Sequence, residues 1–378
     1  MDASEIVERL YESPSTLKDV GRRSIFRFLD PDDYDRFLQT LSSRSSSGKR
    51  FRDIRTLDLV HAVSCPSDTI CLLPSLNGQV YWEEDAPIQL HALPKGAIVS
   101  EKGIPWGVRH IQAPRAWSRT TGLRVKVGVI DTGADFGHPD LHHSLERGIN
   151  LLNRLAPPQD DNGHGTHIAG TIAAANALHG MIGVAPRSTI YPVKAFDHNG
   201  TAYVSDIILG IEWCVRHQMD VVNMSFGMKT KSRSLLNAVN HAYHSGVLIV
   251  ASSGNDGRVG DIDYPAGYPH TIAVGATNRA SRIAKFTNRS SSIDIYAPGD
   301  RIVSSWLSGK QREMSGTSMA TAHVTGAVAL LLSHKPELTP AQIKTIVKNS
   351  AKPLKNGKAL RSAGELNVTR MIKASENA

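Results

Sequence analysis

Residues 127–133, Val-Gly-Val-Ile-Asp-Thr-Gly, are an apolar run that ends in a carboxylate and a glycine turn. A continuous run of this kind is typical of a strand buried on both faces of a parallel sheet. In such a sheet, reactive groups gather where the strands end, so Asp131 stands where chemistry is expected. Taken alone, Asp131 is equally compatible with a residue that only caps the turn.

Similar apolar runs recur along the chain and alternate with segments of helical pattern. They occupy residues 125–130, 189–194, 221–224, 247–251 and 272–274. Strands separated by helices predict a mainly parallel sheet with helices on both faces. We therefore expect a three-layer α/β/α domain over residues 105–378.

The region before this domain has a different pattern and predicts a small α+β unit over residues 24–92. Its expected strands are residues 24–28, 56–64 and 78–82, with a helix that begins near Pro31. Residues 1–23 are expected to form an N-terminal arm. Residues 93–104 contain proline, two glycines and two lysines, which is typical of an exposed linker.

The net charge of +8 is distributed unevenly over the 378 residues. Residues 1–102 hold 13 basic and 16 acidic side chains, whereas residues 103–378 hold 30 and 19. Opposite net charges favour docking of the two regions. The basic residues are scattered and form no basic-aromatic motif, so we expect no nucleic-acid partner. No apolar stretch approaches the roughly 20 residues of a membrane span, so we expect no membrane partner.

Cysteine usage and the first residues suggest a cellular location. Residues 1–9 lack the basic cluster and apolar core of a secretory signal peptide. Three cysteines, Cys65, Cys71 and Cys214, argue against a disulfide framework and suit a reducing compartment. We expect a cytoplasmic protein, with export by an unusual route as the alternative.

Two further segments contain side chains suited to chemistry. Residues 161–173, Asp-Asn-Gly-His-Gly-Thr-His-Ile-Ala-Gly-Thr-Ile-Ala, place two histidines among small residues at the start of a helix. A metal site is the alternative, but no third ligand follows at a matching spacing. Residues 314–331 place Ser318 before a run of small and apolar residues, where a helix's positive end favours developing negative charge. The alternative for Ser318 is a simple helix cap.

Together the three segments supply an acid, a base and a nucleophile for acyl transfer. The motifs Asp-Thr-Gly, His-Gly-Thr-His-Ile-Ala-Gly and Gly-Thr-Ser-Met-Ala resemble those of the subtilisin-like serine proteases, over about residues 106–368. This resemblance implies a serine endopeptidase that acts on protein or peptide substrates as a monomer. The chemistry implied requires no cofactor.

The resemblance also implies a role for each site residue. Ser318 would attack the peptide carbonyl, His164 would move the proton and Asp131 would hold the imidazole tautomer. His167 would be a structural neighbour. Asn255 would donate a hydrogen bond to the oxyanion, the alternative being a turn residue.

Substrate binding is implied at two segments. One would pair with an extended substrate backbone through Ser225, Phe226 and Gly227. Alignment of residues 264–269 with the family's Tyr-Pro segment puts Asp263 on the floor of the primary pocket. A carboxylate there would favour Lys or Arg before the scissile bond, with Asp256 reinforcing it. The alternative is that the loop 258–262 turns Asp263 outward.

A calcium site is a further implication of the resemblance. Asp140 matches a carboxylate of a family calcium site that is completed by the loop 175–181. Ala177 stands where many members have asparagine, so one ligand is missing. The alternative for Asp140 is a helix or turn cap.

The small unit resembles the family's propeptide, a ferredoxin-like domain that assists folding and inhibits the enzyme until it is cleaved. Residues 80–85 are similar to the end of such prodomains. The protein's own propeptide is therefore an expected partner, removed by a cut within residues 91–104, where Lys95 and Lys102 are basic positions. The alternative is an unrelated interaction domain.

Two other functions are compatible with the family. One is a catalytically silent subtilisin-like binding protein, but such a protein has no chemical need for Asp131, His164, Asn255 and Ser318 together. The other is a regulatory protease restricted to one cellular protein. A screen of unrelated unfolded substrates separates the latter from a general protease.

Overall fold

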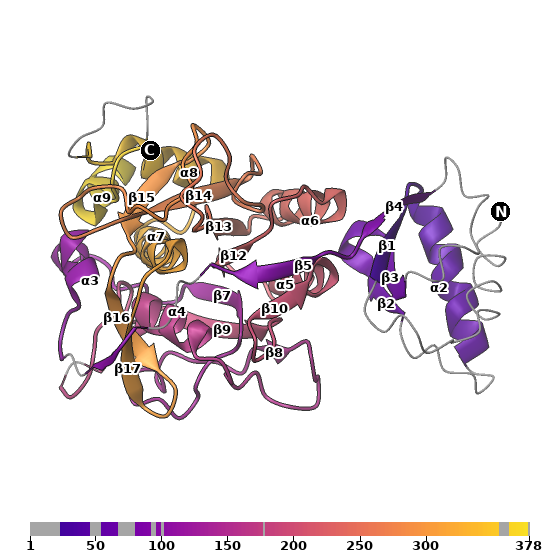
Figure 1. Cartoon of the computed structure of the whole chain (residues 1–378), viewed down its shortest axis with the longest axis horizontal. Helices are drawn as coiled ribbons and strands as arrows, with labels where there is room; N and C mark the ends of the chain where they lie inside the picture. Colours follow the sequence, from indigo (N-terminus) through magenta and orange to yellow (C-terminus); the bar gives the residue numbers. More distant parts are fainter. Residues whose placement is uncertain are drawn as a thin grey trace.

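The computed structural model describes residues 23–45, 54–66, 80–91, 96–99, 102–176, 178–354 and 363–376. Two units are visible, a large one and a smaller one near the N-terminus (Figure 1). The expected N-terminal arm lies outside the described residues except for Arg23.

A parallel sheet of seven strands lies at the centre of the large unit, in the order β15-β14-β13-β11-β7-β9-β8. Each neighbouring pair of strands is parallel. The strands are β7 (Lys126–Asp131), β8 (Ile149–Asn150), β9 (Thr189–Lys194), β11 (Val221–Met224), β13 (Leu248–Ser252), β14 (Thr271–Thr277) and β15 (Ile295–Pro298). This sheet confirms the expected α/β class.

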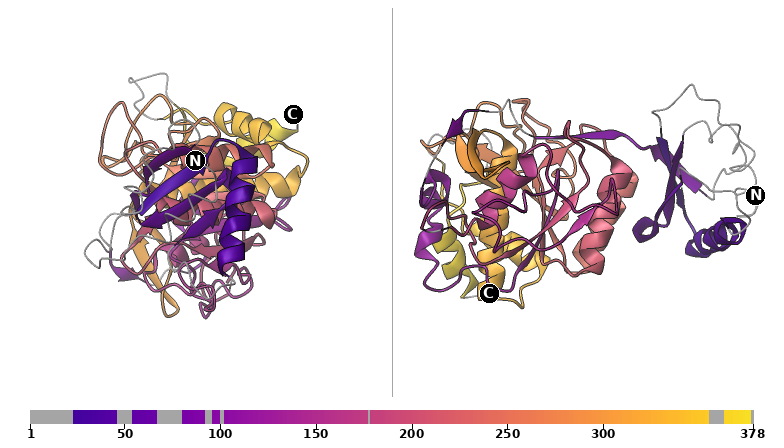
Figure 2. Two further views of the ribbon diagram at one scale, coloured as in Figure 1. Left: turned by 90° about the vertical axis from the view of Figure 1, so that its right-hand side faces the viewer. Right: turned by 90° about the horizontal axis from the view of Figure 1, so that it is seen from below.

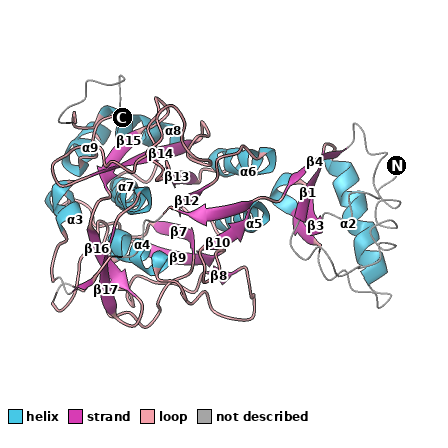
Figure 3. Ribbon diagram, in the orientation of Figure 1, coloured by secondary structure: helices cyan, strands magenta, loops and turns pink. Residues whose placement is uncertain are grey.

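Helices cover both faces of the sheet (Figure 3). One layer contains α3 (Trp106–His110), α4 (His164–Ala173), α7 (Thr317–His334), α8 (Pro340–Asn349) and α9 (Val368–Ser375), and the other contains α5 (Val204–Arg216) and α6 (Arg233–His244). Successive strand residues supply opposite cores: Leu248 and Val250 pack with the α7 layer, whereas Ile249 and Ala251 pack with α5 and α6. Burial on both faces explains the continuous apolar runs.

The order of the strands changes direction at β7. This first strand of the sheet has β9 on one side and β11 on the other, so the chain reverses its direction of travel across the sheet there. In open α/β sheets such a switch point is the usual place for a ligand. Asp131, the last residue of β7, lies at this point.

The small unit is an antiparallel sheet in the order β2-β3-β1-β4, with one described helix. Its elements are β1 (Arg23–Phe28), α2 (Pro31–Ser45), β2 (Arg55–Leu57), β3 (Ala62–Pro66) and β4 (Val80–Glu84). Helix α2 packs on one face through Tyr34 and Phe37. Ile25 and Leu57, on the other face, belong to the same core as α5 and α6. The small unit therefore completes its packing on the large one.

Strand β5 (Pro87–Leu90) leads from the small unit into the large one (Figure 2). It lies between β10 (Thr201–Tyr203) and β12 (Phe226–Gly227) and is antiparallel to both.

The segment expected to be an exposed linker is partly structured. Within it, β6 (Ile98–Val99) pairs with β17 (Lys310–Met314), which in turn pairs with β16 (Ile302–Trp306). Val99 packs against a small apolar cluster, which explains why these residues form an edge strand. None of the helices in the described part of the chain has the length and apolarity needed to cross a membrane.

Candidate active site

Asp131 and His164 are held together where β7 ends and α4 begins. His164 Nδ1 lies 2.8 Å from Asp131 Oδ1 and 2.9 Å from Oδ2, and both residues are buried. The backbone N–H of Thr132 donates to Asp131 Oδ1 over 2.8 Å. These contacts fix the imidazole so that its other nitrogen, Nε2, points away from the carboxylate. Within the described residues that nitrogen is buried and has no hydrogen-bond partner.

Two glycines allow α4 to approach this turn closely. Gly163, just before His164, has a φ of 103°, a left-handed conformation that favours glycine. A Cβ atom on Gly165 would lie 2.1 Å from the carbonyl oxygen of Gly133. The small residues around the two histidines are therefore needed for the position of His164.

Asp160 is a supporting residue that the sequence analysis missed. Its buried carboxylate accepts hydrogen bonds from the hydroxyl of Thr132, from the backbone N–H of Gly163, and from both the backbone N–H and hydroxyl of Thr166. It thereby ties the turn after β7 to the start of α4. The one feature of the sequence that could have pointed to Asp160 is the position of its carboxylate, four residues before His164.

Ser318 is the second residue of α7, and its side chain is buried. Its Oγ lies 2.6 Å from the carbonyl oxygen of His91 and 2.9 Å from that of Ser225. His91, the residue that directly follows β5, therefore lies in contact with Ser318. A peptide carbonyl of this chain's own small unit is presented to the hydroxyl.

Asn255 contacts Thr317, the residue before Ser318. Its Oδ1 accepts hydrogen bonds from the backbone N–H and the hydroxyl of Thr317, both over 2.9 Å. Its Nδ2 is buried and is without a hydrogen-bond partner among the described residues. An amide with its oxygen fixed and its nitrogen free can donate to a charge that develops during a reaction.

The cleft holds β5 as an extended peptide. Its residue Leu90 is paired with Phe226, and Gln89 with Gly227. The backbone N–H of His91 donates to the carbonyl of Ser225 over 3.1 Å. Ser225, Phe226 and Gly227 therefore contact the extended backbone of β5 and His91.

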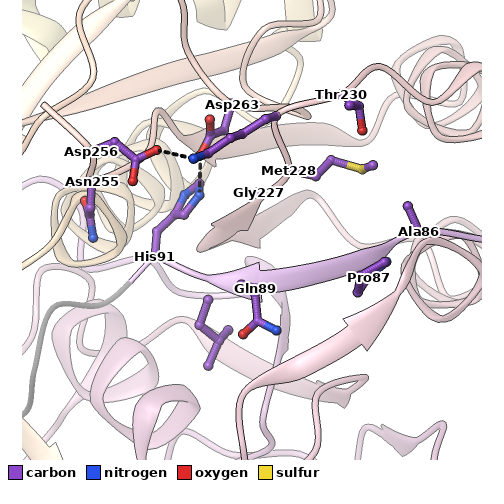
Figure 4. Close-up of a pocket in the computed structure, with 12 residues that line it drawn as sticks. Ala86, Pro87, Gln89, His91, Gly227, Met228, Thr230, Asn255, Asp256 and Asp263 are labelled. Atoms are coloured by element: carbon purple, nitrogen blue, oxygen red, sulfur yellow. Dashed lines mark ion pairs between the residues drawn. The ribbon is translucent and has the colours of Figure 1, made fainter. Parts of the chain in front are cut away.

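Asp263 is turned inward and faces the side chain of His91 (Figure 4). The distance from His91 Nε2 to Asp263 Oδ2 is 2.9 Å, and both side chains are buried. Burial acts to raise the pKa of Asp263, but the hydrogen bond from His91 and the positive charge of Arg258 hold this pKa below its ordinary value.

His167, the second histidine of the motif, is not part of this arrangement. Burial lowers its pKa to about 3, so the ring is neutral at physiological pH. Its Nε2 donates toward the carbonyl oxygens of Ile302 and Arg312, each at 3.1 Å. His167 thus joins α4 to the β16–β17 hairpin.

Asp140, the residue suggested for a calcium site, has hydrogen-bond partners within the fold. Asn176 Nδ2 donates to Asp140 Oδ1 over 3.1 Å, and Ser305 Oγ lies 3.4 Å from Oδ2. Calcium is bound by carboxylate and carbonyl oxygens, and the site at Asp140 stays a prediction. Ala177 lies outside the described residues, and no group of three metal-binding side chains occurs within them.

Two carboxylates of the small unit bind at helix starts of the large one. Glu83 accepts hydrogen bonds from the backbone N–H groups of Arg233 and Ser234, each over 2.9 Å. Asp85 accepts one from the N–H of Ser205 over 2.8 Å. Carboxylates are favourable there because the first N–H groups of a helix lack partners and carry partial positive charge.

Comparison with known proteins agrees with this geometry. The profile of the subtilase family matches residues 122–365, more than half of the chain. The chain belongs to the subtilase family. It is 45% identical to a subtilisin of Bacillus pumilus over 255 residues, covering 66% of this chain and 92% of that protein.

Other subtilases are similar over most of their length. Subtilisin E of Bacillus subtilis is 42% identical over 287 residues, 72% of this chain and 75% of the relative. An alkaline protease of Alkalihalobacillus alcalophilus is 41% identical over 288 residues, 76% and 72% of the two chains. The family and these relatives identify this subtilase as a serine endopeptidase that acts on proteins or peptides.

The expected cytoplasmic location is wrong. The subtilisins that this subtilase resembles are secreted, extracellular proteases. A small, odd number of cysteines fits a reducing compartment but does not require one, because a domain with a core of this size is stable without disulfides.

Proposed function

We propose that this endopeptidase uses Ser318 as its nucleophile, His164 as its base and Asp131 as the residue that orients the base. The observation that carries this proposal is the 2.6 Å approach of Ser318 Oγ to the carbonyl oxygen of His91, in a peptide held in strand register. The contact between His164 and Asp131 adds support, because it leaves His164 Nε2 free to accept a proton.

The proposed reaction begins with attack of Ser318 Oγ on the carbonyl carbon while its proton passes to His164 Nε2. The carbonyl electron pair moves to the oxygen, which accepts a hydrogen bond from Asn255 Nδ2. Collapse of this intermediate breaks the C–N bond, and His164 returns the proton to the leaving amine. Water then hydrolyses the acyl-enzyme by the same route, which restores Ser318 and releases a carboxylic acid.

We also propose that residues 24–91 are a propeptide and that the first bond cleaved is His91–Ala92. This bond falls at the start of the range 91–104 expected from the sequence. The support is positional, since His91 is the residue whose carbonyl meets Ser318. Glu83 and Asp85 would hold the severed propeptide at α6 and α5, so that β5 remains as an inhibitor.

The primary pocket of this enzyme is proposed to accept, before the scissile bond, a side chain that can donate a hydrogen bond to Asp263. Asp263 supports this preference because its carboxylate contacts the side chain of His91. The calcium site suggested at Asp140 is not part of the proposed function.

A fluorophosphonate reagent tests these roles directly, because an activated serine displaces its fluoride and becomes phosphonylated. We expect the processed enzyme to acquire one label, on Ser318, and His164→Ala to acquire none. Labelling is measured by mass spectrometry of tryptic peptides, with folding of both proteins checked by circular dichroism. Labelling of His164→Ala at the wild-type rate would contradict the role assigned to His164.

A further inference from the structure

The pocket beside Ser318 contains the imidazole of His91, and both ring nitrogens have partners. Nε2 faces Asp263 Oδ2 at 2.9 Å, and Nδ1 lies 2.7 Å from Ser252 Oγ. The wall is shaped for this ring, because a Cβ atom on Gly227 would lie 2.4 Å from its Cε1. Figure 4 shows His91 pointing from the end of β5 toward Asp263. The pocket therefore satisfies an imidazole at two points.

The carboxylate of Asp263 is already paired with a cation of the protein itself. Its other oxygen, Oδ1, accepts a hydrogen bond from the guanidinium of Arg258. Arg258 Nε lies 3.2 Å from Asp256, and Lys229 Nζ lies 3.3 Å from the same carboxylate. Two carboxylates and two cations thus balance one another around the pocket. A lysine or arginine from a substrate would add a third cation to a neutral group.

The chemistry of the side chains then separates histidine from its competitors. The imidazole meets Asp263 with one ring nitrogen and the hydroxyl of Ser252 with the other, whereas lysine and arginine can only donate. An aromatic or aliphatic side chain would leave Asp263 Oδ2 buried without its donor, which is costly. Both competing classes are therefore disfavoured by groups already in the pocket.

We propose that this pocket selects histidine before the scissile bond, and that Arg258 sets the choice of histidine over lysine and arginine. The inference rests on the proposed function, since it names the substrate class of the same site. Asp263 forms the hydrogen bond that favours histidine. The positive charge of Arg258 repels the ammonium of lysine and the guanidinium of arginine.

The test uses peptides that are identical except for His, Lys, Arg, Phe or Leu before the cleaved bond. Enzyme is prepared from the full chain, and active sites are counted with the fluorophosphonate. We expect kcat/KM for the histidine peptide to exceed each of the others by about tenfold or more, as one buried hydrogen bond implies. A higher kcat/KM for Phe or Leu overturns the inference.

Two variants locate the source of the selectivity. Arg258→Ala should raise kcat/KM for the lysine and arginine peptides about tenfold relative to histidine, because Asp263 then lacks its internal partner. Asp263→Asn, which keeps the shape of the side chain, should remove the advantage of histidine over phenylalanine. Asp261→Asn is the matched control, since this carboxylate is exposed in the same loop. It should leave all ratios unchanged.

The outcomes separate the inference from the proposed function. Failure to cleave any peptide, or to take up the label, counts against the function itself and removes the basis of the inference. Efficient cleavage with an unchanged Lys/His ratio in Arg258→Ala overturns the inference alone. The ratio of two substrates on one enzyme is independent of how much protein folds, so a partly unfolded variant still gives a decisive value.

Discussion

Replacement of Ser318 by alanine is expected to lower kcat by about 10⁶-fold, the loss known for a subtilisin without its nucleophile. The physical reason is that, among the residues that the structure describes, Ser318 has the hydroxyl that contacts the carbonyl of His91, so its loss closes the acyl-enzyme route. The fold should persist, because the substitution removes only the contacts of one hydroxyl with the carbonyl oxygens of His91 and Ser225. The measurement is kcat on a peptide substrate, with thermal unfolding as the check on structure.

The matched control is Ser315→Ala, three residues earlier. Ser315 Oγ accepts from the backbone N–H of Arg301 and donates to Asp300, so it does not face the cleft. This variant should keep a kcat close to that of the wild type. A comparable loss in both variants would mean that the start of α7, and not the Ser318 hydroxyl, is what activity requires.

Replacement of Asp131 by asparagine is expected to lower kcat by about 10⁴-fold. The amide would donate a hydrogen bond to His164 Nδ1, which places the ring proton on Nε2. His164 could then no longer take the proton of Ser318, although the geometry would be preserved. The measurement is kcat at pH 7 on the same peptide, per mole of folded protein.

Asp161→Asn serves as the control for this second loss. Asp161 is half-exposed and pairs with Lys194 at 2.7 Å, close to the site but away from the imidazole. It should change kcat little. Near-normal turnover by Asp131→Asn would show that the imidazole tautomer is set by another group, which would contradict the proposed role of Asp131.

The central sheet could be predicted because its strands are buried on both faces. The runs at residues 189–194 and 221–224 coincide with β9 and β11. Strand β6 could not be predicted, since residues 98 and 99 are extended only because β17, over 200 residues later, offers an edge. Long-range pairing of this kind has no local pattern in the sequence.

The same division applies to the site. Asp131, His164 and Ser318 could be proposed from the sequence because each lies in a motif with its own small residues. The position of His91 beside Ser318 was not identified, because it depends on a contact between residues 227 positions apart. The pairing of Asp263 with Arg258 could not be predicted either, since it depends on how the loop between them folds.

The intact mass and N-terminal sequence of the full chain, followed over time beside Ser318→Ala, test the central claim most directly. If Ser318 cleaves the chain's own β5 peptide, the wild type alone shortens and its new N-terminus is Ala92. A new N-terminus after Lys95 or Lys102 would contradict the assignment of His91 to the pocket. Shortening of Ser318→Ala at the wild-type rate would contradict self-processing by Ser318.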